Sequence, residues 1–512
     1  MKMNNEENTM IPIRSVQECK EFEQLIMDKY HISSLMLMEM VTTNIIEEHL
    51  HFFGCRTISI FCGTGNNGGD GFSLARKLSN QYTVTVFWYG DESKMTPETA
   101  YQYQCTSQIV KVIHLQTQDD LERYVHSADV AIDCLIGLQS TYELRGFVVN
   151  ILERIRSLVF RKVFAIDVPT GVNPTTGEGH QFAIQPTDLL TIGSVKAGLI
   201  SGEIGNSLPF PQVVKLTDFK ATIEQKSNRG MLEFDDVRHI LPDRKSNVWK
   251  FDMGHAVVVA GSSSMLGAGV FVANTAISVG AGLVTLLTTS RHPSIKPEVM
   301  VHTITSQEHG NMTILSFDEM KPFLDKATVI AIGPGLGNSY ESIKLTARII
   351  EEYHSKVPIV VDADGLLAID TEKIYSSNVV LTPHLGEFKR LASIDFDTAK
   401  KEYIERTSSL AYSMKCIIHT KSAPSITSNG VEEFWVPADA PSLATAGSGD
   451  VLTGIITGII AQGVDTFHAT ALGAFLHREA AKRFEKSNAE ELLTASKLID
   501  YIDFEPHEDT CR

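Results

Sequence analysis

The sequence lacks a surplus of basic residues. Its 45 Lys and Arg residues are outnumbered by 62 Asp and Glu residues, which gives a formal net charge of −17. Proteins that bind nucleic acid neutralise backbone phosphates with clustered Lys and Arg side chains. We therefore expect no nucleic-acid partner, whereas a small anionic ligand remains compatible because it needs only a few local donors.

Cysteine is scarce and scattered, since the seven cysteines form no Cys-x-x-Cys pair. An odd number without a recognisable spacing argues against a disulfide framework and against a zinc site. A reducing compartment fits this usage best. The N-terminal segment 1–10 is polar and has no apolar stretch typical of a signal peptide, so we expect a cytoplasmic protein.

A long uninterrupted apolar run is also missing. Residues 256–290 contain no charged residue, but glycine and serine interrupt them at 261–264 and glycine again at 280–282. A membrane-spanning helix needs about 20 consecutive apolar residues. The segment instead predicts a strand, a Gly/Ser loop, a buried helix over 266–280 and a second strand, so we expect no membrane partner.

The chain contains no short-period repeat and no low-complexity tract, but it does contain two series of short apolar strands alternating with helices. At about 100–200 residues per domain, its length of 512 residues predicts two to four domains. The predicted strands are 57–62, 83–88, 129–133, 163–167 and 188–192, then 256–260, 283–288, 328–332, 358–361, 378–381 and 416–420. This alternation is typical of α/β domains with a parallel sheet between helices. The polar stretch 215–230 predicts the linker, and we place the domains at 1–222 and 223–512.

A glycine-rich segment, Gly63–Gly71, follows the first strand and precedes a helix predicted over 71–79. It contains the pattern Gly-x-Gly-x-x-Gly, in which glycines allow phosphate to approach the backbone at a helix N-terminus. That pattern alone is weak. Asp91 lies about 20 residues further on, where a dinucleotide-binding dehydrogenase carries an acidic ribose contact, so that interpretation stays open. A glycine turn that binds no ligand is the other interpretation.

Amide and carboxyl side chains accompany these glycines and end two further strands. Asn66, Asn67 and Asp70 lie within the glycine segment, and Asp133 and Asp167 end later strands. Such oxygen ligands suit alkali or alkaline-earth cations, and ligands of open α/β sheets gather at the carboxyl ends of strands. Alternatively, each Asp caps the turn that follows it.

Gly65–Gly71, Asp133 with Gly137, and Asp167–Gly171 together resemble the NAD(P)H-hydrate epimerase domain over roughly residues 15–215. The resemblance implies a Rossmann-like three-layer sandwich that interconverts the R and S hydrates at C6 of the nicotinamide ring. It implies a potassium ion held by Asn67, Asp133 and Thr170, and it makes Asp167 the catalytic acid/base. The implied hydrate contacts are Asn66, Asn67, Gly68, Gly69, Asp70, Gly137, Leu138, Gln139, Glu143 and Asp167.

The loop Thr445–Asp450 precedes an apolar, helix-compatible run over 451–462. Small residues let backbone N–H groups converge, and a helix N-terminus adds positive potential. This arrangement favours a phosphate site in which Asp450 takes the proton of an attacking hydroxyl group. A simple helix cap stays possible for Asp450.

Three further loops follow predicted strands of the second half: Gly333–Gly337, Asp362–Gly365 and Thr382–Glu387. In this order, with Gly261-Ser262 and Ala446–Asp450, they resemble the ADP/ATP-dependent NAD(P)H-hydrate dehydratase, a ribokinase-like α/β enzyme, over roughly 235–500. The resemblance implies hydrate contacts from Ala268, Gly335, His384 and Asp450, with Asp450 catalytic. It implies adenine-nucleotide contacts from Lys421, Ser422, Ala423, Pro424, Ser425 and Gly449, and magnesium carried by ADP or ATP.

The sequence therefore predicts an isomerase and a lyase in one multifunctional metabolite-repair enzyme, in which epimerisation supplies the S hydrate that is dehydrated to NAD(P)H. The predicted partners are hydrated NADH or NADPH and ADP or ATP, and we expect a homo-oligomer. Two alternatives stay open. In the first, the chain would be a ribokinase-like small-molecule kinase with an accessory domain. In the second, the N-terminal domain would only bind a ligand; residues 40–42 and 138–139, which depart from the usual family pattern, motivate this alternative.

Overall fold

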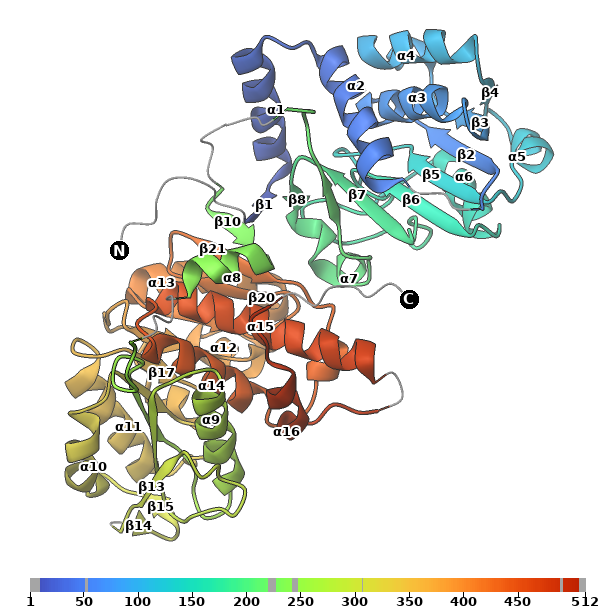
Figure 1. Cartoon of the computed structure of the whole chain (residues 1–512). Coiled ribbons are helices and arrows are strands. Elements are labelled where there is room, and N and C mark those ends of the chain that lie inside the picture. The colour runs from blue at the N-terminus through green and yellow to red at the C-terminus, as the bar shows by residue number, and fades with distance from the viewer. Residues whose placement is uncertain are drawn as a thin grey trace. The chain divides into compact units, whose positions relative to one another are not determined.

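The computed structural model describes residues 10–50, 54–219, 227–241, 247–305, 307–488 and 491–505. The chain divides into two compact units (Figure 1). An N-terminal unit comprises Ile11–Ser227, and a C-terminal unit comprises Asn228–Arg512 together with Met1–Met10. The predicted boundary between residues 222 and 223 lies outside the described residues.

A parallel sheet forms the centre of the N-terminal unit. Among the described residues its strand order is β4-β3-β2-β5-β6-β7-β9, and neighbouring strands run parallel. The strands are β2 (Thr57–Cys62), β3 (Thr83–Trp88), β4 (Lys111–His114), β5 (Val130–Cys134), β6 (Lys162–Ile166), β7 (Asp188–Ile192) and β9 (Gln212–Val214). Two short segments, β1 (Ile11–Arg14) and β8 (Val195–Lys196), pair with each other in parallel.

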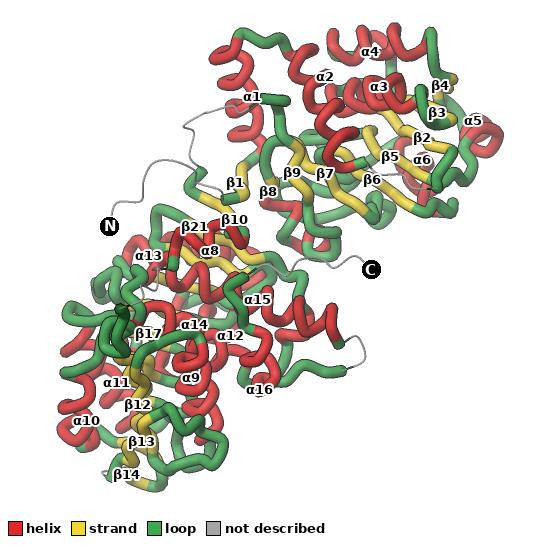
Figure 2. The backbone as a smooth tube through the Cα atoms, in the orientation of Figure 1, coloured by secondary structure: helices red, strands yellow, loops and turns green. Residues whose placement is uncertain are grey.

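Helices cover both faces of this sheet (Figure 2). Successive residues of β2 enter opposite cores. Ile60 packs with α1, α2 and α3, whereas Phe61 packs with α5 and α6. The helices are α1 (Val16–Tyr30), α2 (Ser34–Asn44), a π-helical turn (Ile45–His49), α3 (Asn66–Leu78), α4 (Pro97–Ser107), α5 (Gln118–Tyr124), α6 (Phe147–Arg156) and α7 (Gly202–Gly205), with 3-10 turns at Glu92–Lys94 and Ala197–Leu199. This arrangement confirms the predicted three-layer α/β sandwich.

The glycine-rich segment is helical over most of its length, which corrects the predicted loop. Helix α3 begins at Asn66 rather than at Gly71. A Cβ on Gly68 would lie 2.0 Å from the carbonyl oxygen of Gly63, and a Cβ on Gly71 would lie 2.6 Å from Sγ of Cys62. These glycines therefore let the start of the helix approach the sheet closely, and their spacing does not by itself indicate a loop.

The C-terminal unit is built on a longer sheet. Among the described strands of this unit the order is β13-β12-β11-β16-β17-β18-β19-β20-β21-β10. The strands are β10 (Arg229–Met231), β11 (His255–Val259), β12 (Leu283–Thr288), β13 (Met300–Thr303), β16 (Val329–Ile332), β17 (Ile359–Val361), β18 (Val379–Leu381), β19 (Ile417–Thr420), β20 (Ser425–Ser428) and β21 (Glu433–Val436), with a hairpin of β14 (Gln307–Glu308) and β15 (Asn311–Met312) outside it. Along this order, each strand from β13 through β12, β11, β16, β17 and β18 to β19 runs parallel to its neighbour. Strand β20 runs antiparallel to both β19 and β21.

The helices of this unit again form layers on both faces of the sheet. Val258 of β11 packs with α9, α14 and α15, and its neighbour Val259 packs with α10, α11 and α13. The helices are α8 (Phe234–Ile240), α9 (Leu266–Ser278), α10 (Ser316–Leu324), α11 (Tyr340–Tyr353), α12 (Leu385–Leu391), α13 (Phe396–Met414), α14 (Ser448–Ala461), α15 (Thr466–Ser487) and α16 (Ala495–Leu498), with 3-10 turns at Ala363–Ala368, Pro441–Leu443 and Ile499–Tyr501.

The uncharged stretch 256–290 forms β11, α9 and β12, as predicted. In the part of the chain that the structure describes, no helix has the length and apolar character needed to cross a membrane. Helix α9 packs against α14, and glycines of α14 allow the close approach, since a Cβ on Gly458 would lie 2.2 Å from Cγ2 of Val279.

Candidate active sites

The first candidate site lies at the carboxyl ends of β2, β5 and β6, which are neighbours in the N-terminal sheet (Figure 1). Helix α3 starts after β2, Asp133 lies near the end of β5, and Asp167 follows β6. The parallel order places all three segments at one sheet edge, where ligands of such sheets gather. The structure thus brings together the start of α3, Asp133 and Asp167, which were predicted for the epimerase site.

Asp133 and Thr170 form a buried hydrogen-bonded pair. Oδ2 of Asp133 accepts from the Thr170 backbone N–H at 2.7 Å, and Oδ1 accepts from the Thr170 hydroxyl group at 2.8 Å. Burial raises the pKa of Asp133 to about 6, although the hydrogen bonds from Thr170 and Leu135 oppose this rise. The pair supplies carboxylate and hydroxyl oxygens of the type that a hard cation prefers.

Asn67 carries a buried amide whose hydrogen-bonding capacity is not used within the described residues. Its side chain is only 8% exposed, and neither Oδ1 nor Nδ2 has a hydrogen-bond partner there. Buried polar groups are almost always paired in folded proteins. A Cβ on Gly137 would lie 3.1 Å from Cβ of Asn67, so this amide lies beside the loop after β5, and its oxygen is available to a ligand.

Asp167 has an unusual backbone and a charged partner that the sequence analysis did not identify. Its φ is +68°, a left-handed conformation that L side chains seldom adopt. Its Oδ1 accepts from Nζ of Lys196 at 2.5 Å, and both side chains are largely buried. Lys196 lies in the two-residue strand β8, where no motif or periodic pattern marks it.

Two further carboxyl groups surround Asp167. Burial raises the pKa of Glu23 to about 7 and the pKa of Asp70 well above its usual value. Repulsion from the charge of Asp167 is the second cause at both residues. Glu23 belongs to α1 and Asp70 to α3. The site therefore concentrates acidic groups that hold protons near neutral pH, which suits proton transfer.

The second candidate site lies at the carboxyl ends of β16, β17, β18 and β19, beside the start of α14. At its centre Asp362 accepts from Nζ of Lys421 at 2.7 Å and from the hydroxyl group of Thr453 at 2.7 Å. Burial alone would raise the pKa of Asp362, but Lys421 holds it below its usual value. Asp362 is therefore a fixed anion that anchors Lys421.

Asp450 lies in the first turn of α14, after Gly447 with a φ of +85°. Burial raises its pKa to about 7; repulsion from Asp362 and Asp364 adds to this, and Lys421 opposes it. A Cβ on Gly449 would lie 3.4 Å from Nζ of Lys421. The structure thus places the predicted base next to two of the predicted nucleotide contacts.

The predicted hydrate contacts Ala268 and Gly335 also lie together. A Cβ on Gly335 would lie 3.0 Å from Cβ of Ala268, and the φ of Gly335 is +66°. The carbonyl oxygen of Gly335 accepts from the Ser262 backbone N–H at 2.6 Å. Gly337 donates its N–H to Asp364 at 2.8 Å, so the Gly333–Gly337 loop joins the loops after β11 and β17.

Comparison with known proteins covers both units. The family described as YjeF-related protein N-terminus matches residues 34–198, and the family described as NAD(P)H-hydrate dehydratase matches residues 256–503. A curated relative from Moorella thermoacetica, named bifunctional NAD(P)H-hydrate repair enzyme Nnr, is 30% identical over 512 residues, covering 95% of this chain and 95% of its own. The chain belongs to this family of bifunctional NAD(P)H-hydrate repair enzymes.

A further curated relative and two solved structures are also similar to this chain. A Coxiella burnetii protein of the same name is 29% identical and covers 87% of this chain and 89% of its own. Among solved structures, the Bacillus subtilis ADP/ATP-dependent NAD(P)H-hydrate dehydratase co-crystallised with ATP and Mg²⁺ is 24% identical, with a TM-score of 0.44, and covers 53% of this chain and 95% of its own. A ribokinase-like protein from Enterococcus faecalis is 22% identical, with a TM-score of 0.48, and covers 56% of this chain and 96% of its own.

His384, a predicted hydrate contact of the repair enzyme, accepts hydrogen bonds from the backbone at the start of a helix. It precedes α12, and its Nδ1 accepts from the backbone N–H groups of Gly386 at 2.9 Å and Glu387 at 3.3 Å. Its side chain is 60% exposed. His384 thus caps the helix, and Nε2, 3.4 Å from Oε1 of Glu387, is the ring nitrogen left to face a ligand.

The segment Lys421–Ser425, predicted to contact the nucleotide, connects the antiparallel strands β19 and β20. The hydroxyl group of Tyr403 donates to the carbonyl oxygen of Pro424 at 2.8 Å. Ala423 is exposed, and Ser422 and Ser425 are half-buried. The segment is therefore held at Pro424 while its neighbours remain accessible.

Some predicted contacts of the N-terminal unit face solvent or the core. Gln139 is exposed, and Glu143 is also exposed, 3.9 Å from Arg145. Leu138 packs against a small apolar cluster. Asp91, which kept a dinucleotide-binding alternative open, accepts the N–H of Ser93 and caps a short 3-10 turn.

Residues 38–42, of which 40–42 depart from the usual family pattern, link α2 to α3. The carboxyl group of Glu39 forms ion pairs with Arg76 and Lys77. The hydroxyl group of Thr42 lies 2.9 Å from that of Ser73 and accepts from Nζ of Lys77 at 2.8 Å. These contacts therefore join α2 to α3, the helix that carries Asn67.

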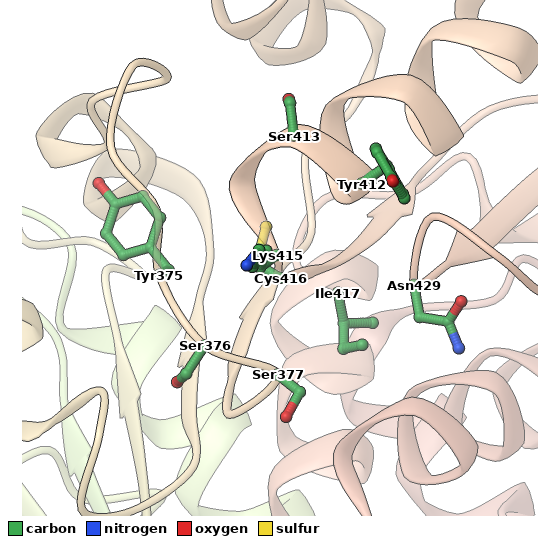
Figure 3. A pocket seen from close by; sticks show the side chains of 9 residues that line it. All are labelled: Tyr375, Ser376, Ser377, Tyr412, Ser413, Lys415, Cys416, Ile417 and Asn429. Carbon is green, nitrogen blue, oxygen red and sulfur yellow. The ribbon is translucent and has the colours of Figure 1, made fainter.

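Surface cavities are found among the described residues of the C-terminal unit. One of about 560 Å³ is lined by Tyr375, Tyr412, Cys416 and Ile417, among others (Figure 3). It lies where β19 begins, at the edge opposite the predicted site, and contains none of the predicted site residues. Another, of about 350 Å³, includes Ala444 and Thr445 and adjoins the loop that leads into α14.

Proposed function

We propose that the two units catalyse consecutive steps in the repair of hydrated NADH or NADPH. The N-terminal unit epimerises the hydrate at C6 of the nicotinamide ring, and the C-terminal unit dehydrates the S hydrate with ADP or ATP. Membership in the family of bifunctional repair enzymes carries this proposal. It favours repair over the alternative of a small-molecule kinase.

In the C-terminal unit the poor leaving group of the hydrate has to be activated. Asp450 accepts the proton of the C6 hydroxyl group as its oxygen attacks the terminal phosphoryl group and displaces ADP from ATP or AMP from ADP. The C6 oxygen then leaves as phosphate, and C5 of the ring loses a proton as the C5–C6 double bond forms. The pKa of Asp450, about 7, lets it accept that proton near neutral pH. Lys421, anchored on Asp362, supplies positive charge beside Gly449.

We propose that magnesium accompanies ADP or ATP in this reaction. It would neutralise charge on the nucleotide phosphates. The acidic groups Asp362 and Asp364 lie at the site, but Asp362 is already engaged by Lys421 and Thr453. The residues that fit the nucleotide remain Lys421–Ser425 and Gly449, and Asp364 is the carboxyl group best placed to face the metal.

In the N-terminal unit, inversion at C6 requires the hydroxyl group to leave and water to add to the opposite face. The ring nitrogen supplies the electron pair that expels the hydroxyl group as water, and it recovers that pair when the new C6–O bond forms. A carboxyl group must give one proton to the leaving oxygen and take one from the incoming water. Asp167 is our candidate, with Glu23 and Asp70 next to it.

We propose that potassium is held by Asn67, Asp133 and Thr170. The buried amide oxygen of Asn67 is unpaired within the described residues. The carboxyl group of Asp133 and the hydroxyl group of Thr170 lie 2.8 Å apart. These oxygen donors fit a monovalent cation, which would supply positive charge near the bound hydrate.

We further propose a cytoplasmic, homo-oligomeric enzyme. Six of the cysteines, all in described segments, are free thiols, which suits a reducing compartment. Light scattering on the purified chain measures the assembly directly. A mass equal to one chain would refute the oligomer.

The test of the main proposal is to incubate the full chain with hydrated NADH and ATP or ADP. We expect the absorbance of the dihydronicotinamide ring to return only when the nucleotide is present. Transfer of phosphate to an added sugar or alcohol, with no recovery of that absorbance, would contradict the proposal and favour the kinase alternative.

A further inference from the structure

Lys196 of the N-terminal unit is a buried lysine whose ammonium group is fixed by three acceptors. Its side chain is 1% exposed. Nζ donates to Oδ1 of Asp167 at 2.5 Å, to the carbonyl oxygen of Ile192 at 2.9 Å and to the hydroxyl group of Thr191 at 3.0 Å. An ammonium group has three N–H donors, so these contacts use all of them and hold Nζ in one place.

The two oxygens of Asp167 differ sharply in their surroundings. Oδ1 accepts from Lys196 and, at 3.3 Å, from the Ile192 backbone N–H. Oδ2 has no hydrogen-bond partner within the described residues, and a Cβ on Gly137 would lie 3.4 Å from it. The free oxygen therefore faces the loop after β5 and the unpaired amide of Asn67.

The backbone of Asp167 is fixed as strictly as its side chain. Its φ is +68° and its N–H donates to the carbonyl oxygen of Leu190 at 2.7 Å. Non-glycine residues seldom adopt this conformation, and those that do cluster at functional sites. The backbone conformation aims the carboxyl group, and Lys196 holds Oδ1, so that Oδ2 turns toward the loop after β5.

Charged and titratable groups face Asp167 from three elements. Glu23 and Cys19 belong to α1, Asp70 belongs to α3, and Lys196 belongs to β8. Repulsion from Asp167 contributes to the raised pKa values of Glu23 and Asp70, whereas Lys196 opposes the rise at Glu23. Among these groups Lys196 is the cation in direct contact with Asp167.

We propose that Lys196 is a positioning residue of the epimerisation, because it holds Oδ1 of Asp167 so that Oδ2 alone meets the oxygen at C6 of the hydrate. This inference rests on the proposed epimerase function. Lys196 does not touch the substrate in this account; it acts through Asp167.

The test replaces Lys196 with methionine, which keeps the aliphatic chain and removes the ammonium group. Misplacement of a reacting group by about 1 Å can cost about 100-fold in rate, and we expect a loss of that order in epimerisation. Dehydration of the S hydrate by the same sample should not change. The matched control is Lys162→Met. Nζ of Lys162 in β6 lies 3.2 Å from Oδ1 of Asp188 in the neighbouring β7, and this variant should leave both activities intact.

A double-mutant cycle separates positioning from folding. If Lys196 acts through Asp167, then adding Lys196→Met to Asp167→Asn should cost little further activity. The loss in Lys196→Met should appear in kcat with KM little changed, because Lys196 does not touch the substrate. Additive losses in the cycle, or an unchanged kcat in Lys196→Met, would overturn the inference.

A milder variant covers the case in which Lys196→Met lowers the unfolding temperature. Thr191→Val removes one of the three acceptors and leaves Lys196 in place, and we expect about a tenfold loss of epimerisation. Unchanged epimerisation in Thr191→Val would then overturn the inference. If the wild-type chain itself fails to interconvert the epimers, the proposed epimerase function fails instead.

Discussion

Asp450→Asn should abolish dehydration and yet stabilise the C-terminal unit. The pKa of Asp450 rises from 3.8 to about 7, which corresponds to about 4 kcal/mol of preference for the neutral form. Relaxation and entering water reduce this upper bound, so we expect the neutral amide to add about 1–2 kcal/mol of stability at alkaline pH. That gain raises the unfolding temperature by a few degrees.

The sign of the pH dependence follows from the direction of the shift. Because folding raises the pKa of Asp450, its contribution to stability is fully present below its ordinary pKa of 3.8 and is lost as the pH rises through about 7. The variant should therefore exceed the wild type most above about pH 7, and the difference should shrink toward about pH 4. Differential scanning calorimetry across this range measures it.

A neighbouring carboxyl group supplies the contrasting control. Asp362 is a fixed anion paired with Lys421, so Asp362→Asn should destabilise the unit. Equal unfolding temperatures for Asp450→Asn and the wild type at alkaline pH would refute the claim that Asp450 is held in an unfavourable environment. A difference that does not change with pH would refute its electrostatic cause.

Four further outcomes are expected. Dehydration by the wild type should fall as the pH drops below about 7, because Asp450 must be ionised to accept a proton; a flat acidic limb in initial rates would contradict this. Asp362→Asn should lower the free energy of unfolding by about 3–5 kcal/mol in denaturant titration, since it leaves a lysine without its anion. Gly68→Ala should destabilise the N-terminal unit by about 1–3 kcal/mol, because the added Cβ would lie 2.0 Å from a backbone oxygen. The control is Gly65→Ala, whose added Cβ would have no atom within 4 Å, and it should cost less than half as much stability. Potassium should raise the unfolding temperature of the wild type more than sodium does, and Asn67→Ala should remove the difference; an equal response of wild type and variant would exclude Asn67 as a ligand.

The strand ends were the part of both sites that could be predicted from the sequence. Short runs rich in Val and Ile predicted the parallel strands, and the polar residues that follow them meet because parallel strands share one carboxyl edge. That reasoning predicted that Asn67, Asp133 and Asp167 would lie near one another, as would Asp362 and Asp450, whereas Thr170 was implied only by the family resemblance. The roles proposed for these residues stay predictions.

Other features had no local pattern from which to predict them. Helix α3 begins in a run of glycines, and propensity alone disfavours a helix there; close contact with Gly63 and Cys62 explains it. Lys196 belongs to a two-residue strand, too short for any periodicity, and its partner Asp167 lies in another element. Strands β20 and β21 were missed because their antiparallel pairing interrupts the alternation of strand and helix.

The most direct measurement of the central claim follows the full chain acting on a mixture of R and S hydrates with ATP or ADP. The recovered dihydronicotinamide absorbance should account for both epimers in the wild type, only for the S share in Asp167→Asn, and for neither in Asp450→Asn. Complete recovery by Asp167→Asn, or near wild-type turnover by Asp450→Asn, would contradict the account of two separate sites acting in sequence.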